Sequence, residues 1–406
     1  MPDKPLKIAL LSVHSCPLGR LGTRDTGGMS VYIRELAREL GKRGHIVDVY
    51  TRIHDDSHGQ IIELGENARL IHLKAGENGL HKLALYIHLP DFACSLENFR
   101  RTNGLKYDLI YSHYWLSAWT GKLLQSWWNI PHVAMFHTLG AVKNAIGIGE
   151  EEPELRVESE RYLIRDCQRI IAATAKEKQD IVSYYGASPE KIGVIPCGVN
   201  PELFRPMDRK SARQQTGFSD ETALFVGRVE PLKGIDKLIM AIARSQEPGL
   251  RLAVIGGDGD GEYESSLKSL CRKLGVQDRV SFPGLVEQEE LPLYYNAARL
   301  CVIPSYYESF GLVALESLAC GTPVISTPVG IAEDILKQNG TGYLVPDNSP
   351  QNLAQKMRLL LSRPLDADMI TSIRASVAAF SWSNVAGVIA GECRKLTSNQ
   401  TRERTV

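Results

Sequence analysis

Short apolar runs alternate with amphipathic segments along most of the chain, and this alternation limits the possible folds more than any other feature of the sequence. Such an order is typical of a parallel sheet covered by helices. In the first half we expect strands at Lys7–Val13, Ile46–Tyr50, Leu70–Leu73, Asp108–Tyr111, Val133–Phe136, Ile170–Ala173 and Gly193–Pro196. In the second half we expect them at Ala223–Val226, Leu252–Ile255, Val280–Phe282, Cys301–Pro304, Val324–Ser326 and Tyr343–Val345.

A stretch with three prolines, Pro196, Pro201 and Pro206, separates the two series and predicts a linker. The 406 residues are too many for one compact core, because a domain has roughly 150 residues. We therefore predict an α/β protein with two doubly wound parallel-sheet domains, residues 1–198 and 199–381, facing each other across a cleft. Doubly wound sheets bind ligands beyond the carboxyl ends of their strands, so the cleft is the expected site of chemistry.

Charge and cysteine content exclude several classes of protein. Lys and Arg together number 47, as do Asp and Glu, so net positive charge does not favour nucleic-acid binding. No apolar run approaches the roughly 20 residues of a membrane span, and we identify no signal peptide at the start. The eight cysteines have no C-x-x-C spacing. We expect a cytoplasmic protein without disulfides.

A glycine-rich turn, Asp25–Met29, precedes the first predicted helix. Glycines such as Gly28 let backbone N–H groups approach an anion at the start of a helix. The alternative is a tight turn that needs positive φ angles. We expect Gly41 and Gly44 to end the helix. Its apolar face consists of Ile33, Leu36, Ala37 and Leu40.

A pair of cations is predicted near the start of the second half. Arg228 follows a strand, and Lys233 stands five residues later, just before a helix. Arginine can bind a diphosphate through two parallel hydrogen bonds, and lysine acts as a compact charge. The alternative is two solvated surface cations.

The segment Glu308–Glu316 carries the most information about a ligand. We expect its helix to begin near Ser309–Phe310, which would place the Glu308 and Glu316 carboxylates on one side, about 12 Å apart. That spacing suits the hydroxyls of the sugar and the ribose of one nucleotide sugar. The alternative is that Glu308 is only a favourable charge at the N-terminus of the helix and that Glu316 is an exposed helix residue. The N–H groups free to bind a phosphate would be those of Phe310, Gly311 and Leu312.

Two loops offer weaker indications of a cofactor. Gly256–Gly261 lacks the third glycine of a dinucleotide fingerprint, and we interpret it as a turn beside the donor phosphates. The alternative is a metal pair formed by Asp258 and Asp260. His54 and His58 could bind a metal, but the sequence offers no third ligand, so we expect a solvated loop and no metal.

All ten histidines lie at or before position 137. His113 and His137 each end a predicted strand, at the edge that faces the predicted cleft. His137 is the better candidate for a residue near the reaction, and the alternative is a structural histidine at the edge of the core.

With these motifs in place, the chain resembles the retaining glycosyltransferases of family 4, which have the GT-B fold of two Rossmann-like domains. Its motifs look most like those of the inositol-phosphate N-acetylglucosaminyltransferases of mycothiol synthesis, followed by sucrose-phosphate synthases. The segments that carry the likeness are DTGGMSVYIRELARELGKRGH, YDLIYSHYWLSAW, FHTLGAVKN, PELRVESE, FVGRVEPLKG, PSYYESFGLVALESLACGTPVIS and TGYLVP.

The resemblance implies roles on the donor side. Arg228 and Lys233 resemble the pair on the donor diphosphate, with Gly28 on its other side. Glu316 is similar to the carboxylate that binds ribose. Glu308 resembles the residue on the donor-sugar hydroxyls, beside the amides of Phe310, Gly311 and Leu312. The residues that resemble the catalytic group are His137, near the transferred sugar, Arg228, Lys233 and Glu308.

The resemblance also implies an acceptor site. The residues that match the phosphate-binding positions of the inositol-phosphate enzymes are Lys82, Tyr114, Thr138 and Arg156. All are present, which favours a phosphorylated acceptor. Ser30 stands where the family's GGMN motif has an asparagine, so the acceptor polyol is expected to differ. The helix at 382–406 resembles the one that crosses back onto the acceptor-binding first domain.

By resemblance, the chain is a hexosyltransferase that moves a sugar from a nucleoside diphosphate to a hydroxyl of a phosphorylated polyol or sugar, with retained configuration and no essential metal. The donor base stays open, and a homodimer is compatible with the sequence. One alternative is the glucose transfer of a sucrose-phosphate synthase. Another is a nucleotide-sugar epimerase of the same fold, which would need acid and base residues flanking C2. A dehydrogenase and a pure binding module are further alternatives.

Overall fold

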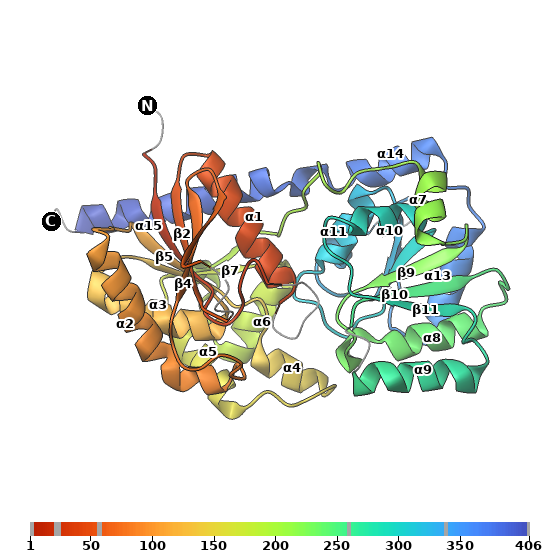
Figure 1. The fold of residues 1–406 in the computed structure, drawn as a ribbon, viewed down its shortest axis with the longest axis horizontal. Helices are drawn as coiled ribbons and strands as arrows, with labels where there is room; N and C mark the ends of the chain where they lie inside the picture. The colour runs from red at the N-terminus through yellow and green to blue at the C-terminus, as the bar shows by residue number, and fades with distance from the viewer. Residues whose placement is uncertain (1–3, 20–25, 55–58, 258–260, 337–339, 404–406) are drawn as a thin grey trace.

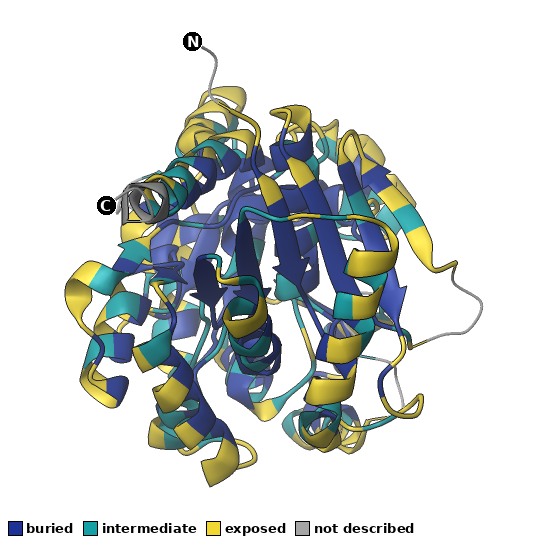
Figure 2. Cartoon of the chain, turned by 90° about the vertical axis from the view of Figure 1, so that its left-hand side faces the viewer, coloured by how far each residue is buried: buried dark blue, intermediate teal, exposed yellow. Residues whose placement is uncertain are grey.

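The structure is a computed structural model that describes residues 4–19, 26–54, 59–257, 261–336 and 340–403. Figure 1 shows two α/β domains side by side, with the C-terminal helices running along one edge of both. Each domain is built on its own sheet, and Figure 2 shows strands as the buried centre and helices exposed on their outer faces. The predicted pair of doubly wound domains is confirmed.

In the described residues the first sheet has eight strands, in the order β3-β4-β2-β1-β5-β6-β7-β8. All pairs are parallel except β3 with β4. The strands are β1 Lys7–Leu11, β2 Ile46–Arg52, β3 Ile61–Gly65, β4 Ala68–Leu73, β5 Leu109–His113, β6 His132–Met135, β7 Arg169–Ala172 and β8 Ile192–Val194. The helices are α1 Gly28–Lys42, η1 Ala84–His88, α2 Leu89–Thr102, α3 Tyr114–Trp128, α4 Gly140–Ile146, α5 Glu154–Asp166, α6 Ala175–Tyr185 and η2 Pro189–Lys191.

The second sheet, over the residues described, has six parallel strands in the order β11-β10-β9-β12-β13-β14. They are β9 Thr222–Val226, β10 Arg251–Ile255, β11 Val280–Gly284, β12 Leu300–Ile303, β13 Val324–Ser326 and β14 Gly342–Leu344. The helices are α7 Arg209–Thr216, η3 Pro231–Lys233, α8 Ile235–Arg244, α9 Glu262–Leu274, α10 Leu291–Ala297, α11 Leu312–Ala319, α12 Ala332–Ile335, α13 Pro350–Leu361, α14 Ala367–Ala375, η4 Ala378–Phe380 and α15 Trp382–Glu403.

The sequence did not predict β3. This strand is antiparallel at the edge of the sheet and mostly exposed, so it lacks the continuous apolar run that marks a buried parallel strand.

The expected helix stop at Gly41 was also wrong, because α1 continues through it to Lys42. A Cβ at Gly41 would lie 1.9 Å from the Glu66 carbonyl oxygen, so the glycine allows the helix to pack closely on the β3–β4 turn. Gly44, with φ +84°, follows the helix as expected.

The chain crosses between the domains twice, and the two crossings lie side by side. The Val199 N–H donates to the Phe380 carbonyl at 2.7 Å, and Val199 forms a parallel bridge with Ser381. Beyond this point α15 packs on α1 of the first domain (Figure 1). An ion pair between Arg169 and Glu392, 2.6 Å apart, also ties α15 to the first domain.

None of the helices in the described part of the chain combines the length and apolar character that a membrane crossing would need. The eight cysteines all lie in described segments and are free thiols, of which Cys94 alone is exposed.

Candidate active site

The N-termini of two helices from different domains meet at the junction. Gly28 is the first residue of α1, and Leu312 is the first residue of α11. A Cβ built on Gly28 would lie 3.4 Å from Cδ1 of Leu312. First-turn N–H groups have no acceptor within their own helix, and each helix start carries partial positive charge. The junction therefore suits a polyanion bound between the two helices.

The start of α11 differs from the prediction. Gly311, with φ +86°, caps the helix in the left-handed region, so the helix begins at Leu312 and not near Ser309–Phe310. Phe310 is buried in the preceding loop, where its carbonyl accepts from the Ile331 N–H at 2.7 Å. Glu308 lies in the loop before the helix, as expected, and Glu316 lies on α11.

Lys233 and Glu308 form an ion pair beside this helix start. Their Nζ and Oε1 atoms are 2.6 Å apart, and the side chains are only 13% and 19% exposed. The Tyr306 N–H donates to the Leu232 carbonyl at 2.9 Å, which holds the two loops together. The Ser305 hydroxyl also donates to Glu308, at 2.8 Å. The pair is thus fixed from both sides and largely screened from water.

Arg228 is held differently from Lys233. Its guanidinium is 3.1 Å from the Glu230 carboxylate, and its side chain is 45% exposed. Both cations follow β9, as predicted, but they pair with different carboxylates. Arg228 is therefore the more accessible of the two.

Glu316 is buried on α11, where the Tyr295 hydroxyl donates to it at 2.8 Å. Burial raises the pKa of Glu316 to about 7, against the lowering effect of hydrogen bonds from Tyr295 and Gln288. Gln288 in turn accepts from the Arg34 guanidinium of α1. A chain of hydrogen bonds therefore links the first domain to Glu316. The sequence did not predict this chain, since 254 positions separate Arg34 from Gln288.

His137 follows β6 with φ +61°, a strained backbone angle for a residue with a side chain. Its Nε2 lies 2.8 Å from Nδ1 of His113, which ends β5. Burial lowers the pKa of His137 to about 3, so the ring is neutral at ordinary pH. A neutral imidazole can donate one hydrogen bond and accept another.

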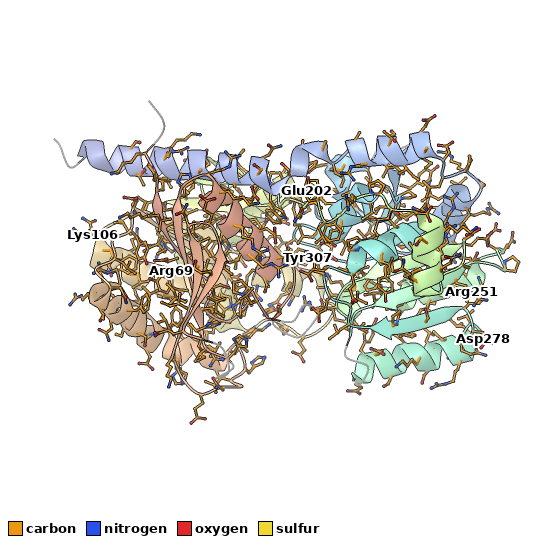
Figure 3. The ribbon with its side chains drawn as sticks, turned by 45° about the horizontal axis from the view of Figure 1, so that its top comes forward. Arg69, Lys106, Glu202, Arg251, Asp278 and Tyr307 are labelled. Carbon is orange, nitrogen blue, oxygen red and sulfur yellow. The ribbon has the colours of Figure 1, made fainter. Side chains whose placement is uncertain are left out.

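Tyr307 brings His137 and Glu308 toward one site. It lies between β12 and α11, precedes Glu308 and packs into the apolar cluster of the first domain. Its side chain hydrogen-bonds the backbone of Leu139, two residues beyond His137. Figure 3 shows Tyr307 at the boundary between the domains.

The structure brings together the side chains predicted to bind an acceptor. Arg156 lies over the Tyr114 ring at 4.9 Å, and its Nη2 donates to both the carbonyl and the hydroxyl of Thr138 at 2.9 Å. The sequence had not singled out His14, whose ring centroid is 4.4 Å from that of Tyr114. Burial lowers the pKa of His14 to about 3, and the nearby charges of Lys82 and Arg156 contribute.

Arg156 is also paired with two carboxylates. It is 1% exposed, with Nε 2.7 Å from Glu160 and Nη1 2.8 Å from Glu152. Glu160 accepts further hydrogen bonds from the Gly140 N–H and the Tyr185 hydroxyl. Most donors of Arg156 are therefore occupied. The four-residue spacing of the three charges could have revealed this network from the sequence.

Ser30 is buried in α1, and its hydroxyl lies 2.8 Å from that of Ser15. Among the other predicted positions, Asp25, His58, Asp258 and Asp260 lie outside the described residues.

Two family models match the chain. The model described as Glycosyltransferase Family 4 matches residues 26–203, and that described as Glycosyl transferases group 1 matches residues 208–375. The D-inositol 3-phosphate glycosyltransferase of Geodermatophilus obscurus is 38% identical over 394 residues, covering 93% of this chain and 87% of the relative. The D-inositol 3-phosphate glycosyltransferase 2 of Catenulispora acidiphila is 39% identical over 409 residues, covering 96% and 95%.

Among solved structures, sucrose-phosphate synthase from Thermosynechococcus elongatus is similar with a TM-score of 0.88 and 33% identity, covering 97% of this chain and all of that one. Anabaena HepE in complex with UDP-glucose has a TM-score of 0.77 at 19% identity, covering 96% of this chain and all of that one, and shows a shared fold. From these matches and the two facing sheets, the chain belongs to glycosyltransferase family 4 and has the GT-B fold.

Proposed function

We propose that the protein transfers a hexosyl group from a nucleoside-diphosphate sugar to a hydroxyl of a phosphorylated polyol or sugar. Relatives at 38–39% identity are named for D-inositol 3-phosphate, and the sucrose-phosphate synthase at 33% identity is named for a sugar phosphate. Both names favour a phosphorylated acceptor. Glucose transfer of the sucrose-phosphate-synthase kind is the second candidate.

The meeting of the α1 and α11 N-termini beside Lys233 carries the proposal. Breaking the bond between the sugar and the diphosphate leaves negative charge on the departing phosphate. Free N–H groups and a screened cation, already oriented, stabilise such charge without reorganisation. A metal ion is then not required for this step.

We assign the donor contacts accordingly. Gly28, with the N–H groups of Phe310, Gly311 and Leu312, approaches the phosphates. Lys233 gives one hydrogen bond to Glu308, which leaves two N–H groups for phosphate oxygens. The more exposed Arg228 approaches the diphosphate from its own loop.

Glu308 accepts from the sugar hydroxyls with its remaining oxygen, and Glu316 accepts from the ribose hydroxyls. His137, being neutral, hydrogen-bonds a hydroxyl of the transferred sugar. We propose retention of configuration, with the acceptor hydroxyl attacking the sugar and passing its proton to the leaving phosphate oxygen.

The acceptor phosphate is assigned to the cluster of Lys82, Tyr114, Thr138 and Arg156, and Ser30 lies on the acceptor side. Arg156 has most of its donors engaged by Glu160, Thr138 and Glu152. We further propose a cytoplasmic location, since the cysteines are free thiols. A homodimer is compatible with this function.

The test is turnover of Lys233→Ala, with UDP, ADP and GDP sugars as donors and D-inositol 3-phosphate or a ketohexose phosphate as acceptors. We expect kcat to fall by about 10²–10³, the usual loss when one such charge-stabilising donor is removed. Arg228→Ala should lose activity of the same order.

The matched control is Lys237→Ala, which removes the same charge from α8, where Lys237 pairs with Asp236. Near-parental turnover of Lys233→Ala would contradict the diphosphate assignment. Isomerisation of the donor without any acceptor would instead indicate the epimerase.

A further inference from the structure

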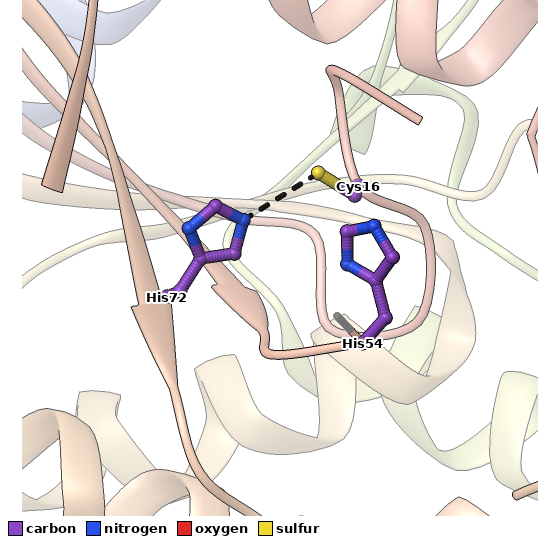
Figure 4. Close-up of side chains that lie close together, drawn as sticks. All are labelled: Cys16, His54 and His72. Atoms are coloured by element: carbon purple, nitrogen blue, oxygen red, sulfur yellow. Dashed lines mark hydrogen bonds between the residues drawn. The ribbon is translucent and has the colours of Figure 1, made fainter. Parts of the chain in front are cut away.

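Three side chains capable of binding a metal meet in the first domain, and none of them is among the residues assigned to the transfer. Cys16 lies in the loop after β1, His54 follows β2, and His72 is the penultimate residue of β4. These three strands are neighbours in the sheet, so their carboxyl ends share one edge. Figure 4 shows the three side chains converging there.

The distance between the Cys16 and His72 ligand atoms is close to that in a tetrahedral zinc site. One ligand atom from each residue lies within 4.8 Å of the others, and Cys16 Sγ is 3.7 Å from His72 Nε2. Zn–S and Zn–N bonds of about 2.3 and 2.05 Å at a tetrahedral angle place these two atoms about 3.5 Å apart. Only a small adjustment would admit the ion between them.

The ring of His72 is already oriented for a metal. Its Nδ1 lies 3.0 Å from the Gly59 carbonyl oxygen. A carbonyl only accepts hydrogen bonds, so Nδ1 carries the proton and Nε2 presents its lone pair toward Cys16. A backbone carbonyl on the far nitrogen is the usual second contact of a metal-binding histidine.

The set of donor atoms selects the metal. One sulfur and two imidazole nitrogens suit Zn²⁺, whereas Mg²⁺ and Ca²⁺ require oxygen ligands.

We propose that Cys16, His54 and His72 bind one Zn²⁺ ion. On binding, the Cys16 thiol loses its proton to solvent and the thiolate sulfur bonds to zinc. Each histidine supplies one nitrogen lone pair, and water takes the fourth position on the exposed side of His54. His54 and His58 alone had suggested a solvated loop, but the fold supplies Cys16 and His72.

The ion would fix the loop after β1 to β2 and β4. Cys16 directly follows Ser15, whose hydroxyl contacts Ser30. Zinc would therefore steady the acceptor side of the cleft without taking part in the transfer chemistry. The binding of zinc goes beyond the proposed function and does not depend on it, whereas its effect on the acceptor side rests on the assignment of Ser30.

The experiment titrates the full chain, freed of metal by a chelator, with Co²⁺ and then Zn²⁺. We expect one equivalent of Co²⁺ to give the visible bands of a tetrahedral site together with a thiolate-to-cobalt charge-transfer band, and Zn²⁺ to displace it. No such absorption in the parent protein would overturn the proposal.

Variants identify the ligands. Cys16→Ser should abolish the charge-transfer band, and His54→Ala should weaken Zn²⁺ binding by more than the 10- to 100-fold typical of losing a second-shell contact. His54 is exposed, so its variant should fold. Cys94→Ser, at the exposed cysteine, should leave both readouts unchanged. An unaltered Zn²⁺ affinity in His54→Ala, or an unaltered spectrum in Cys16→Ser, would overturn the assignment.

Discussion

Replacing Arg156 by alanine tests whether this side chain mainly binds the acceptor or mainly stabilises the residues around the site. By resemblance alone, Arg156→Ala should weaken binding of the phosphorylated acceptor and leave hydrolysis of the donor nearly intact. The structure changes this expectation, because Arg156 is buried between Glu152 and Glu160 and also holds Thr138. Its loss would leave two buried carboxylates without their shared cation.

The magnitude follows from the partners that remain. Removing one member of a buried ion pair destabilises a protein by about 3–5 kcal/mol. Glu160 would keep its hydrogen bonds from Gly140 and Tyr185, and Glu152 would keep Lys143, so we expect the lower end, about 3 kcal/mol. At about 2–4 °C per kcal/mol for a domain of this size, Tm of the first domain should fall by roughly 6–12 °C.

Differential scanning calorimetry measures this shift, alongside KM for the phosphorylated acceptor and hydrolysis of the donor alone. Both activities should fall together, because Arg156 fixes Thr138 next to His137. The matched control is Arg161→Ala, which removes an exposed arginine of the same helix that pairs with Glu158; surface changes of this kind stay within about 0.5 kcal/mol. A Tm of Arg156→Ala within about 2 °C of the parent, with a change in acceptor KM alone, would refute the reasoning.

Acidification should unfold the first domain before the second, as followed by calorimetry from pH 7 to 5. Burial lowers the pKa of His132 to about 3 and that of His113 well below its usual value. As the pH falls below about 6.5, the His132 and His113 rings therefore take up a proton only in the unfolded chain, and the free energy of unfolding falls by about 2 kcal/mol per histidine by pH 5. A second domain that melts first would contradict this. Glu316→Gln should stabilise the unliganded protein at pH 8 and remove the pH dependence of UDP-glucose affinity between pH 6 and 8. The reason is that burial raises the Glu316 pKa to about 7, so its stabilising contribution is complete below about pH 4.5 and is lost as pH rises through 7. A variant no more stable than the parent at pH 8 by calorimetry, or a UDP-glucose affinity that still changes between pH 6 and 8 by titration, would contradict this. Arg34→Ala should raise KM for the donor several-fold with little change in Tm, because it breaks the bond to Gln288; unchanged steady-state kinetics would argue against this link.

The sequence was most informative where a candidate site residue comes directly after a buried strand. Apolar runs located the parallel strands, and the ends of those strands located Arg228 and His137. It was less informative where a single backbone angle decides the geometry, as at Gly311, whose left-handed conformation delays the start of α11. An exposed edge strand such as β3 gives no buried apolar run to recognise.

Contacts between distant segments were beyond prediction. Arg34 and Gln288 are joined only because the two domains meet, and nothing local marks either residue. The same holds for Cys16 and His72, which β1, β2 and β4 bring to one edge. The pairing of Arg156 with Glu160 differs, since its spacing is visible in the sequence and could have been used.

The paired crossings at Val199 and Ser381 determine how the two domains can move. Two adjacent chain segments joined by a bridge permit rotation about one axis far more readily than sliding or twisting. Contacts near that axis, such as the Tyr32–Trp382 ring pair at 5.4 Å, persist through the rotation. A rotation about this axis would change the contact between Tyr307 and Leu139, which joins the two domains away from the crossings.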